Sequence, residues 1–117
     1  MTSDTRPDNL QEHTTQLQEV AQAAPSGRSA HLLYGGPGTT LSQTVIALRS
    51  GASLAEHQNP GEATLLVLHG NVRLHAGDQS WEGSQGDLLV VPEQRHGLDA
   101  LTDATVLLTA AKLSRST

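Results

Sequence analysis

Glycine-containing turns divide the stretch from Gly51 to Leu101 into short segments with the periodicity of β-strands. Val72, Leu74 and Ala76 alternate with polar residues, which is typical of a strand with one buried and one exposed face. The run 63–69 is almost continuously apolar and predicts a strand that is covered on both sides. Many short strands separated by such turns predict an all-β fold, a single small barrel or jelly roll.

Two turns in this stretch suggest how the strands are connected. His69-Gly70-Asn71-Val72 and Ala76-Gly77-Asp78-Gln79 each place a glycine where a positive φ costs little, so both are expected to be two-residue hairpins. The segments before, between and after them would then form a three-stranded antiparallel meander. Further strands are expected at 87–91, which Pro92 ends because it lacks a ladder donor, at 96–100 and at 104–111.

The chain before residue 30 predicts one helix in front of the barrel. Residues 1–8 are expected to form a flexible tail, and Asp8 is expected to cap a helix over 9–24. Apolar residues recur in this helix at three- and four-residue steps, so its apolar stripe should dock on a sheet or on a partner subunit. The barrel is expected over 30–112, with strands at 30–34 and 40–49, and a C-terminal tail over 113–117.

Composition restricts the partners and the core. Seven Lys and Arg residues stand against 12 Asp and Glu, a net charge of −5, and no basic stripe indicates a nucleic-acid partner. No apolar run approaches the roughly 18 residues of a membrane span, so a cytoplasmic protein is expected. Cys and Phe are absent, which excludes a thiolate ligand or nucleophile and leaves Leu, Val, Ile and Ala to build the core.

Side chains that could bind a metal occur near both ends of the stretch 51–101. His57, Asn59 and Glu62 lie near its start, and His96 lies near its end. Strand alternation places Ser53, Ala55, His57 and Asn59 on one face of their strand, with Leu54 and Glu56 on the other. Two imidazoles and a carboxylate that meet inside a barrel would suit a divalent metal, and the same set with open positions serves oxygen-activating iron(II) sites.

These residues and their spacing resemble the cupin superfamily. Its first motif is Gly, five residues, His-x-His, three or four residues, Glu, six residues, Gly. Gly51 and His57 fit this motif, Asn59 stands at the second His, and Glu62 comes one place early. The second motif is Gly, five residues, Pro-x-Gly-x-x-His.

In the second motif Gly86 and Pro92 fit, Gln94 replaces the Gly, and His96 comes one residue early. The resemblance covers about residues 40–111. It implies that His57 and His96 are the principal ligands of a divalent Zn, Fe, Mn or Ni ion, with Asn59 offering an amide oxygen. Glu62 would face the wrong side unless a bulge re-aims it. The resemblance also favours a homodimer.

Three functions remain open at this point. The first is a binding module that holds a metal or a small polar ligand in a pocket lined by Leu65, Val67, Leu89 and Val91. The second is a metal-dependent enzyme of the dioxygenase or isomerase type. The third is a metal-free scaffold or assembly protein, in which His57 and His96 are hydrogen-bonded residues of the barrel wall.

Overall fold

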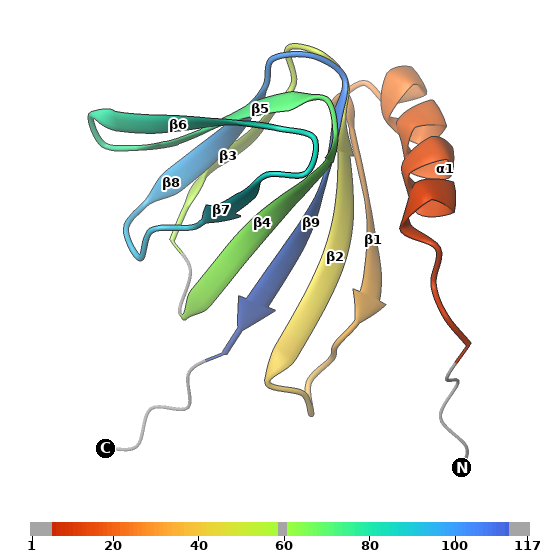
Figure 1. The fold of residues 1–117 in the computed structure, drawn as a ribbon, viewed down its shortest axis with the longest axis horizontal. Helices are drawn as coiled ribbons and strands as arrows, with labels where there is room; N and C mark the ends of the chain where they lie inside the picture. Colours follow the sequence, from red (N-terminus) through yellow and green to blue (C-terminus); the bar gives the residue numbers. More distant parts are fainter. Residues whose placement is uncertain (1–5, 59–60, 113–117) are drawn as a thin grey trace.

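The structure, a computed structural model, describes residues 6–58 and 61–112. In this part of the chain one helix is followed by nine strands (Figure 1). They are α1 (Leu10–Ala23), β1 (Arg28–Tyr34), β2 (Leu41–Leu48), β3 (Ser53–His57), β4 (Glu62–His69), β5 (Asn71–Ala76), β6 (Gln79–Ser84), β7 (Leu88–Val90), β8 (His96–Ala100) and β9 (Ala104–Ala111). The all-β prediction with an N-terminal helix is therefore confirmed, and the arrangement is a jelly roll.

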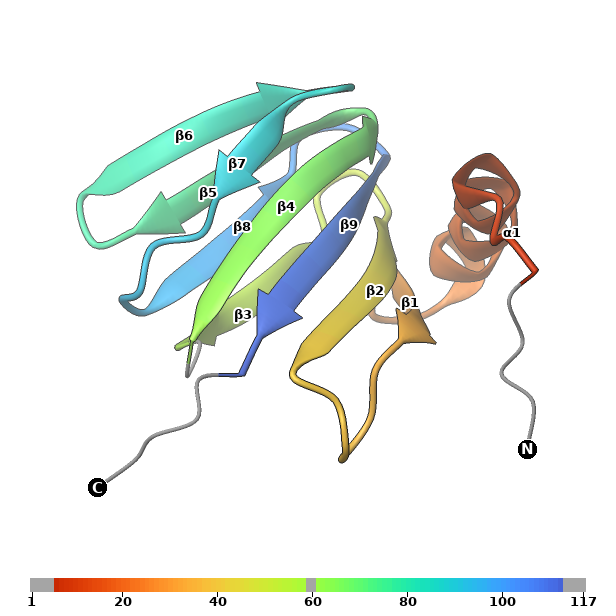
Figure 2. The ribbon, with the colours of Figure 1, turned by 60° about the horizontal axis from the view of Figure 1, so that its bottom comes forward.

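The strands form two antiparallel sheets that face each other (Figures 1 and 2). The five-stranded sheet has the order β1-β2-β9-β4-β7, and the four-stranded sheet has the order β3-β8-β5-β6. Consecutive strands are therefore often in different sheets. This topology brings β3 and β8, which are far apart in the sequence, into direct pairing at one edge of the four-stranded sheet.

The predicted meander is only half right. β5 and β6 form the expected hairpin, in which Ala76 pairs with Gln79 across a two-residue turn that contains Gly77 at φ +58°. β4 does not pair with β5, however, because it lies between β7 and β9 in the other sheet. Gly70, at φ +78°, is thus the point where the chain crosses from one sheet to the other. Turn composition alone could not distinguish this corner from a hairpin.

Aliphatic side chains from both sheets fill the space between them, as the composition predicts. The buried cluster consists of Ile46, Leu48, Ala63, Leu65, Val67, Val72, Leu74, Val91, Leu98, Ala100, Ala104 and Val106. Removing such side chains from water is the main favourable term in folding, at about 25 cal/mol per Å² of apolar surface. The alternation along β4 and β5 leaves Leu65, Val67, Val72 and Leu74 on the inner faces.

The helix covers the outer face of the five-stranded sheet, where Val45 and Ala47 are fully buried (Figure 2). Gln18 ties it down, because its Nε2 donates to the carbonyl oxygen of Ala104 at 2.7 Å and to the Thr105 hydroxyl at 3.1 Å. Docking of the helix on a sheet is therefore confirmed.

The cap of the helix differs from the prediction by one residue. Asn9, not Asp8, is the N-cap, and its Oδ1 accepts a hydrogen bond from the backbone N–H of Glu12 at 2.9 Å. The carboxylate of Asp8 instead lies 3.1 Å from Nε2 of His13. In the part of the chain that the structure describes, no helix combines the length and apolarity needed to cross a bilayer.

Candidate functional site

The structure brings His57 and His96 together. They are register partners across β3 and β8, and the centroids of their rings lie 4.6 Å apart. His96 is buried, with 5% of its surface exposed, whereas His57 is exposed. The pair therefore sits at the mouth of the space between the two sheets, with one imidazole inside and one at the rim.

A β-bulge aims His57 at this position. Leu54 pairs with Leu98 and His57 pairs with His96, so Ala55 and Glu56 together stand opposite a single residue of β8. Leu54 and His57 consequently both point inward although they are three residues apart. The predicted alternation is wrong for the residues before the bulge. Ser53 faces outward, and its hydroxyl donates to Asp99 Oδ1 at 2.8 Å.

Backbone carbonyls set the tautomers of both rings. Nδ1 of His57 lies 3.2 Å from the carbonyl oxygen of Ala55, and Nδ1 of His96 lies 2.9 Å from that of Gln94. A carbonyl can only accept, so each neutral ring carries its proton on Nδ1 and has a lone pair on Nε2. Neither Nε2 has a hydrogen-bond partner among the described residues.

The cavity next to the two rings has the size of a single small occupant. Its volume is about 20 Å³, and a buried water needs roughly 10–15 Å³ on such a scale. Apart from the two histidines its walls are almost entirely aliphatic. They comprise Leu54, Leu65, Leu74, Val91, Gly97, Leu98 and Leu108. One ion or one water fits in this cavity, and His57 is the exposed one of the two histidines that line it.

The angle between the rings distinguishes this pair from the second close pair of histidines. A metal lies in the plane of each imidazole that binds it, so the planes of two ligands must intersect near the ion. The planes of His57 and His96 meet at 57°. Those of His13 and His31, on α1 and β1, are stacked at 19° and nearly parallel, with centroids 5.0 Å apart. Of these two pairs of described residues, the tilted one is compatible with a shared ion, whereas the stacked one is not.

The other two ligand candidates do not join this pair in the described structure. Glu62 precedes the inward-facing Ala63 on β4, and it lines a different cleft of about 570 Å³, which shares Val91 with the cavity at the two histidines. No bulge re-aims it at this end of the strand. Asn59 lies outside the described residues. Within residues 6–58 and 61–112 no group of three His, Asp or Glu side chains is arranged to hold a metal ion. Of the four ligand candidates, the described structure thus brings together two, His57 and His96, and imidazole is a ligand type that suits a divalent transition metal.

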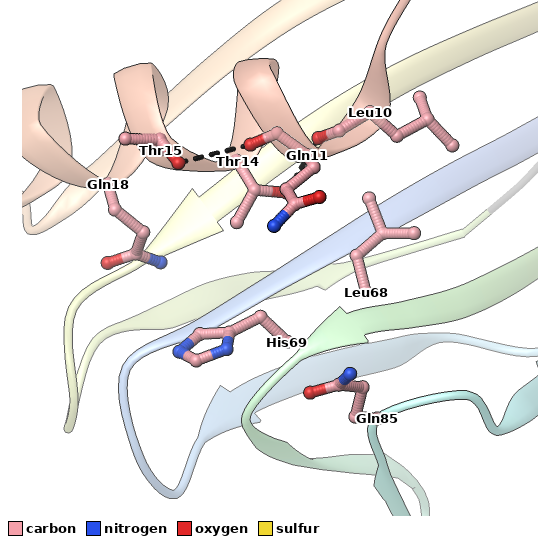
Figure 3. A pocket seen from close by; sticks show the side chains of 8 residues that line it. All are labelled: Leu10, Gln11, Thr14, Thr15, Gln18, Leu68, His69 and Gln85. Atoms are coloured by element: carbon pink, nitrogen blue, oxygen red, sulfur yellow. Dashed lines mark hydrogen bonds between the residues drawn. The ribbon is translucent and has the colours of Figure 1, made fainter.

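A larger cleft of about 650 Å³ lies between the helix and the end of β4 (Figure 3). Leu10, Gln11, Thr14, Thr15 and Gln18 line it from the helix side, and Leu68, His69 and Gln85 line it from the sheet side. The Gln18 amide is already used for docking the helix, and both threonine hydroxyls donate to helix carbonyls. This cleft contains no acid–base pair and no pair of metal ligands.

The clearest electrostatic perturbation lies at the opposite end of β3. The pKa of Asp103 is lowered from 3.8, mainly because its carboxylate accepts the backbone N–H of Ser50 at 2.8 Å, with further contributions from Gln22, His69 and Arg49. Asp103 lies beside Gly70, at the corner where the chain passes from one sheet to the other. Asp103 is not among the residues that line the cavity at His57 and His96.

Comparison with known proteins agrees with this architecture. A family model described as a cupin domain matches residues 44–111. Among curated proteins none matches significantly. A cupin superfamily protein from Desulfitobacterium hafniense is similar over 95% of this chain and 94% of its own, with 18% identity and a TM-score of 0.72.

Two further solved structures are similar. A conserved protein of unknown function from Streptococcus pyogenes shares 22% identity over 79% of this chain and 80% of its own, with a TM-score of 0.70. An RmlC-like cupin protein from Desulfovibrio desulfuricans shares 27% identity over 72% of this chain and 81% of its own, with a TM-score of 0.63. Two of the three sequence identities are below 25%, so these similarities are evidence for the fold alone.

Proposed function

Because this chain belongs to the cupin domain family, we propose that its barrel binds one divalent transition-metal ion between His57 and His96. The observation that carries the proposal is the state of the two rings. Both Nδ1 atoms lie next to backbone carbonyls, both Nε2 atoms lack a hydrogen-bond partner among the described residues, and both histidines line the same small cavity. Neutral imidazole with its other nitrogen hydrogen-bonded is the usual form of a histidine metal ligand.

The donor set favours some ions over others. Imidazole nitrogen suits zinc, iron, nickel and copper, whereas manganese prefers carboxylate and other oxygen ligands. Glu62 lines another cleft, so the choice among zinc, iron, nickel and manganese narrows to the first three. Asn59, water or a small polar molecule would complete the coordination sphere. The bound ion would supply a Lewis acid at the rim of the barrel.

This arrangement supports a binding function ahead of a specific reaction. A cavity of about 20 Å³ holds the ion or one water, so a small-molecule ligand must approach the ion from the rim on the side of His57. Because the walls of the cavity are aliphatic, the two imidazoles are the polar side chains in its lining that a ligand would contact. The dioxygenase or isomerase alternative would require a substrate at the same rim.

Cobalt(II) titration of metal-stripped protein tests the proposal. We expect one equivalent to bind with a visible absorption spectrum typical of nitrogen ligation, and zinc to displace it. A His57→Ala, His96→Ala double variant should not bind, while His69→Ala, which removes a histidine at the far end of β4, should bind normally. A wild-type protein that binds neither cobalt nor zinc would instead favour the metal-free scaffold.

The homodimer expected from the sequence is part of the same proposal. β7 is an edge strand of the five-stranded sheet, and its Leu88 and Val90 are 61% and 75% exposed. Edge strands with exposed apolar residues are usually covered in the working assembly. Light scattering during gel filtration measures the mass directly. The cytoplasmic setting stays a prediction, and cell fractionation tests it.

A further inference from the structure

A group of charged side chains lies on the outer face of the four-stranded sheet, behind the two histidines. We call Glu56, His75, Arg95 and Asp99 the outer cluster. His75 is at its centre: its Nδ1 is 3.8 Å from Glu56 Oε2, and its Nε2 is 3.5 Å from Asp99 Oδ1. Nε of Arg95 lies 3.4 Å from the other oxygen of Glu56. The cluster thus links β3, β8 and β5 from outside.

The place of Glu56 in this cluster connects it to the metal-binding pair. Glu56 is one of the two residues of the bulge in β3, and it directly precedes His57. β3 is an edge strand that pairs only with β8, and the register between them is interrupted at the bulge. The backbone ladder therefore fixes His57 weakly on its own. The contacts of Glu56 with His75 and Arg95 are made on the other side of the sheet from His57.

Gly97 of β8 lets the side chain of His75 on β5 approach the backbone of β8 closely. It stands opposite the bulge and is the register partner of His75 on β5. A Cβ at position 97 would lie 2.6 Å from Cε1 of His75 and 3.2 Å from the carbonyl oxygen of Leu54. Only glycine therefore lets the imidazole of His75 lie across β8 and reach toward Glu56 on β3. Its immediate neighbour in the sequence is His96, whose side chain points to the opposite face.

We propose that Glu56 and His75 are positioning residues, which hold the bulge in β3 and thereby aim His57 at His96. This inference rests on the proposed metal-binding function, because the position of His57 matters only if His57 binds a metal. The contacts of Glu56 and His75 do not depend on that function. Partners outside the ligands of a metal typically change its affinity by about 10–100-fold when they are removed. Here they would act through the backbone of the bulge, since neither side chain touches the cavity between the sheets.

The test uses the full chain with Glu56→Ala, His75→Ala, and the double variant. Two quantities are measured at neutral pH: the nuclear Overhauser effect between the ring protons of His57 and His96 in metal-free protein, and the dissociation constant for cobalt(II). Urea unfolding midpoints confirm that each variant is folded. The matched control is Glu82→Ala, because Glu82 also forms an ion pair on this outer face, with Arg73 at 3.0 Å, but far from the bulge.

We expect each single variant to lose most of the ring-to-ring effect and to bind cobalt about tenfold more weakly. The double variant should be no worse than the singles, because both residues belong to one chain of contacts. Glu56→Gln, which keeps an acceptor toward His75, should restore much of both signals, and Glu82→Ala should match the wild type.

The two proposals fail in different ways. An unchanged ring-to-ring effect in His75→Ala and Glu56→Ala overturns the positioning role, whatever the metal does. A wild type with a strong ring-to-ring effect that binds no cobalt overturns the metal site alone. Should Glu56→Ala fail to fold, His75→Ala and Glu56→Gln decide the question by the same two measurements.

Discussion

His57 and His96 face each other across β3 and β8 with their ring centroids 4.6 Å apart, although 38 residues separate them in the chain. Both side chains line one small, mostly aliphatic cavity, and the Nδ1 atom of each lies next to the carbonyl oxygen of the residue two positions earlier in the sequence. The same local hydrogen bond, to the carbonyl oxygen two residues earlier, thus places the proton of each neutral ring on Nδ1. This arrangement supports the proposed metal-binding role of the two imidazoles.

Gly70→Ala should be one of the most damaging glycine substitutions. An added Cβ would meet the carbonyl oxygen of Asp103 at 2.0 Å, in a backbone conformation at φ +78°. The left-handed conformation alone costs about 1–2 kcal/mol for a residue with a Cβ, and the clash adds to it. Urea denaturation measures the loss. Gly77→Ala is the control, because it has a positive φ but no atom within 4 Å, and it should lose only about 1 kcal/mol.

Gln18→Ala should loosen the helix without unfolding the barrel. The substitution removes the donor to the carbonyl oxygen of Ala104 and to the hydroxyl of Thr105. A buried acceptor that loses its partner costs about 1–3 kcal/mol. Hydrogen exchange should therefore become faster in α1 and at Val45 beneath it. Gln16→Ala, at an exposed position of the same helix, should leave exchange unchanged, and equal exchange in both variants would contradict this role of Gln18.

Asp103→Asn should change the pH dependence of stability in a defined direction. The pKa of Asp103 is lowered from 3.8 in the folded protein, mainly by the N–H of Ser50. A group of this kind contributes stability that is fully present above its unfolded pKa and is lost as the pH falls through the folded pKa. The wild type should exceed the variant in unfolding free energy at pH 7, and the gap should close as the pH falls below 3.8 and through the folded pKa. A gap that widened in acid would contradict this assignment.

Zinc should stabilise the fold through the histidine pair. An ion that binds only the folded state at 100 times its dissociation constant raises the unfolding free energy by about 2.7 kcal/mol. Chelator should reverse the gain. Thermal unfolding with and without zinc measures it, and the His57→Ala, His96→Ala variant should show no zinc-dependent shift. An equal shift in that variant would place the ion elsewhere.

The sequence was sufficient for the fold class, since strand periodicity and glycine turns are local signals. It also predicted the strand at 96–100, in which His96, Leu98 and Ala100 are all buried. It could not assign strands to sheets. The partner of β4 is β9 rather than β5, and that choice depends on contacts between distant segments such as Leu65 with Leu108.

The site was predicted only in part, because a single bulge changes which side chains face inward. Simple alternation placed His57 inward together with Ser53, but the bulge at Ala55 and Glu56 is what lets Leu54 and His57 share the inner face. Sequence reasoning placed Glu56 on the face opposite His57 and gave neither Glu56 nor His75 a role in the site. The one available signal was Gly97, a glycine inside a strand, which often marks a bulge or a close approach of neighbouring groups.

Long-range proton–nitrogen correlation of the histidine rings tests the central claim most directly. In metal-free protein at pH 7.5 we expect both His57 and His96 to show the tautomer with the proton on Nδ1. One equivalent of zinc should then shift both Nε2 resonances together and leave those of His31 and His69 in place. Rings that carry their proton on Nε2, or Nε2 resonances that do not respond to zinc, would contradict the proposed metal site.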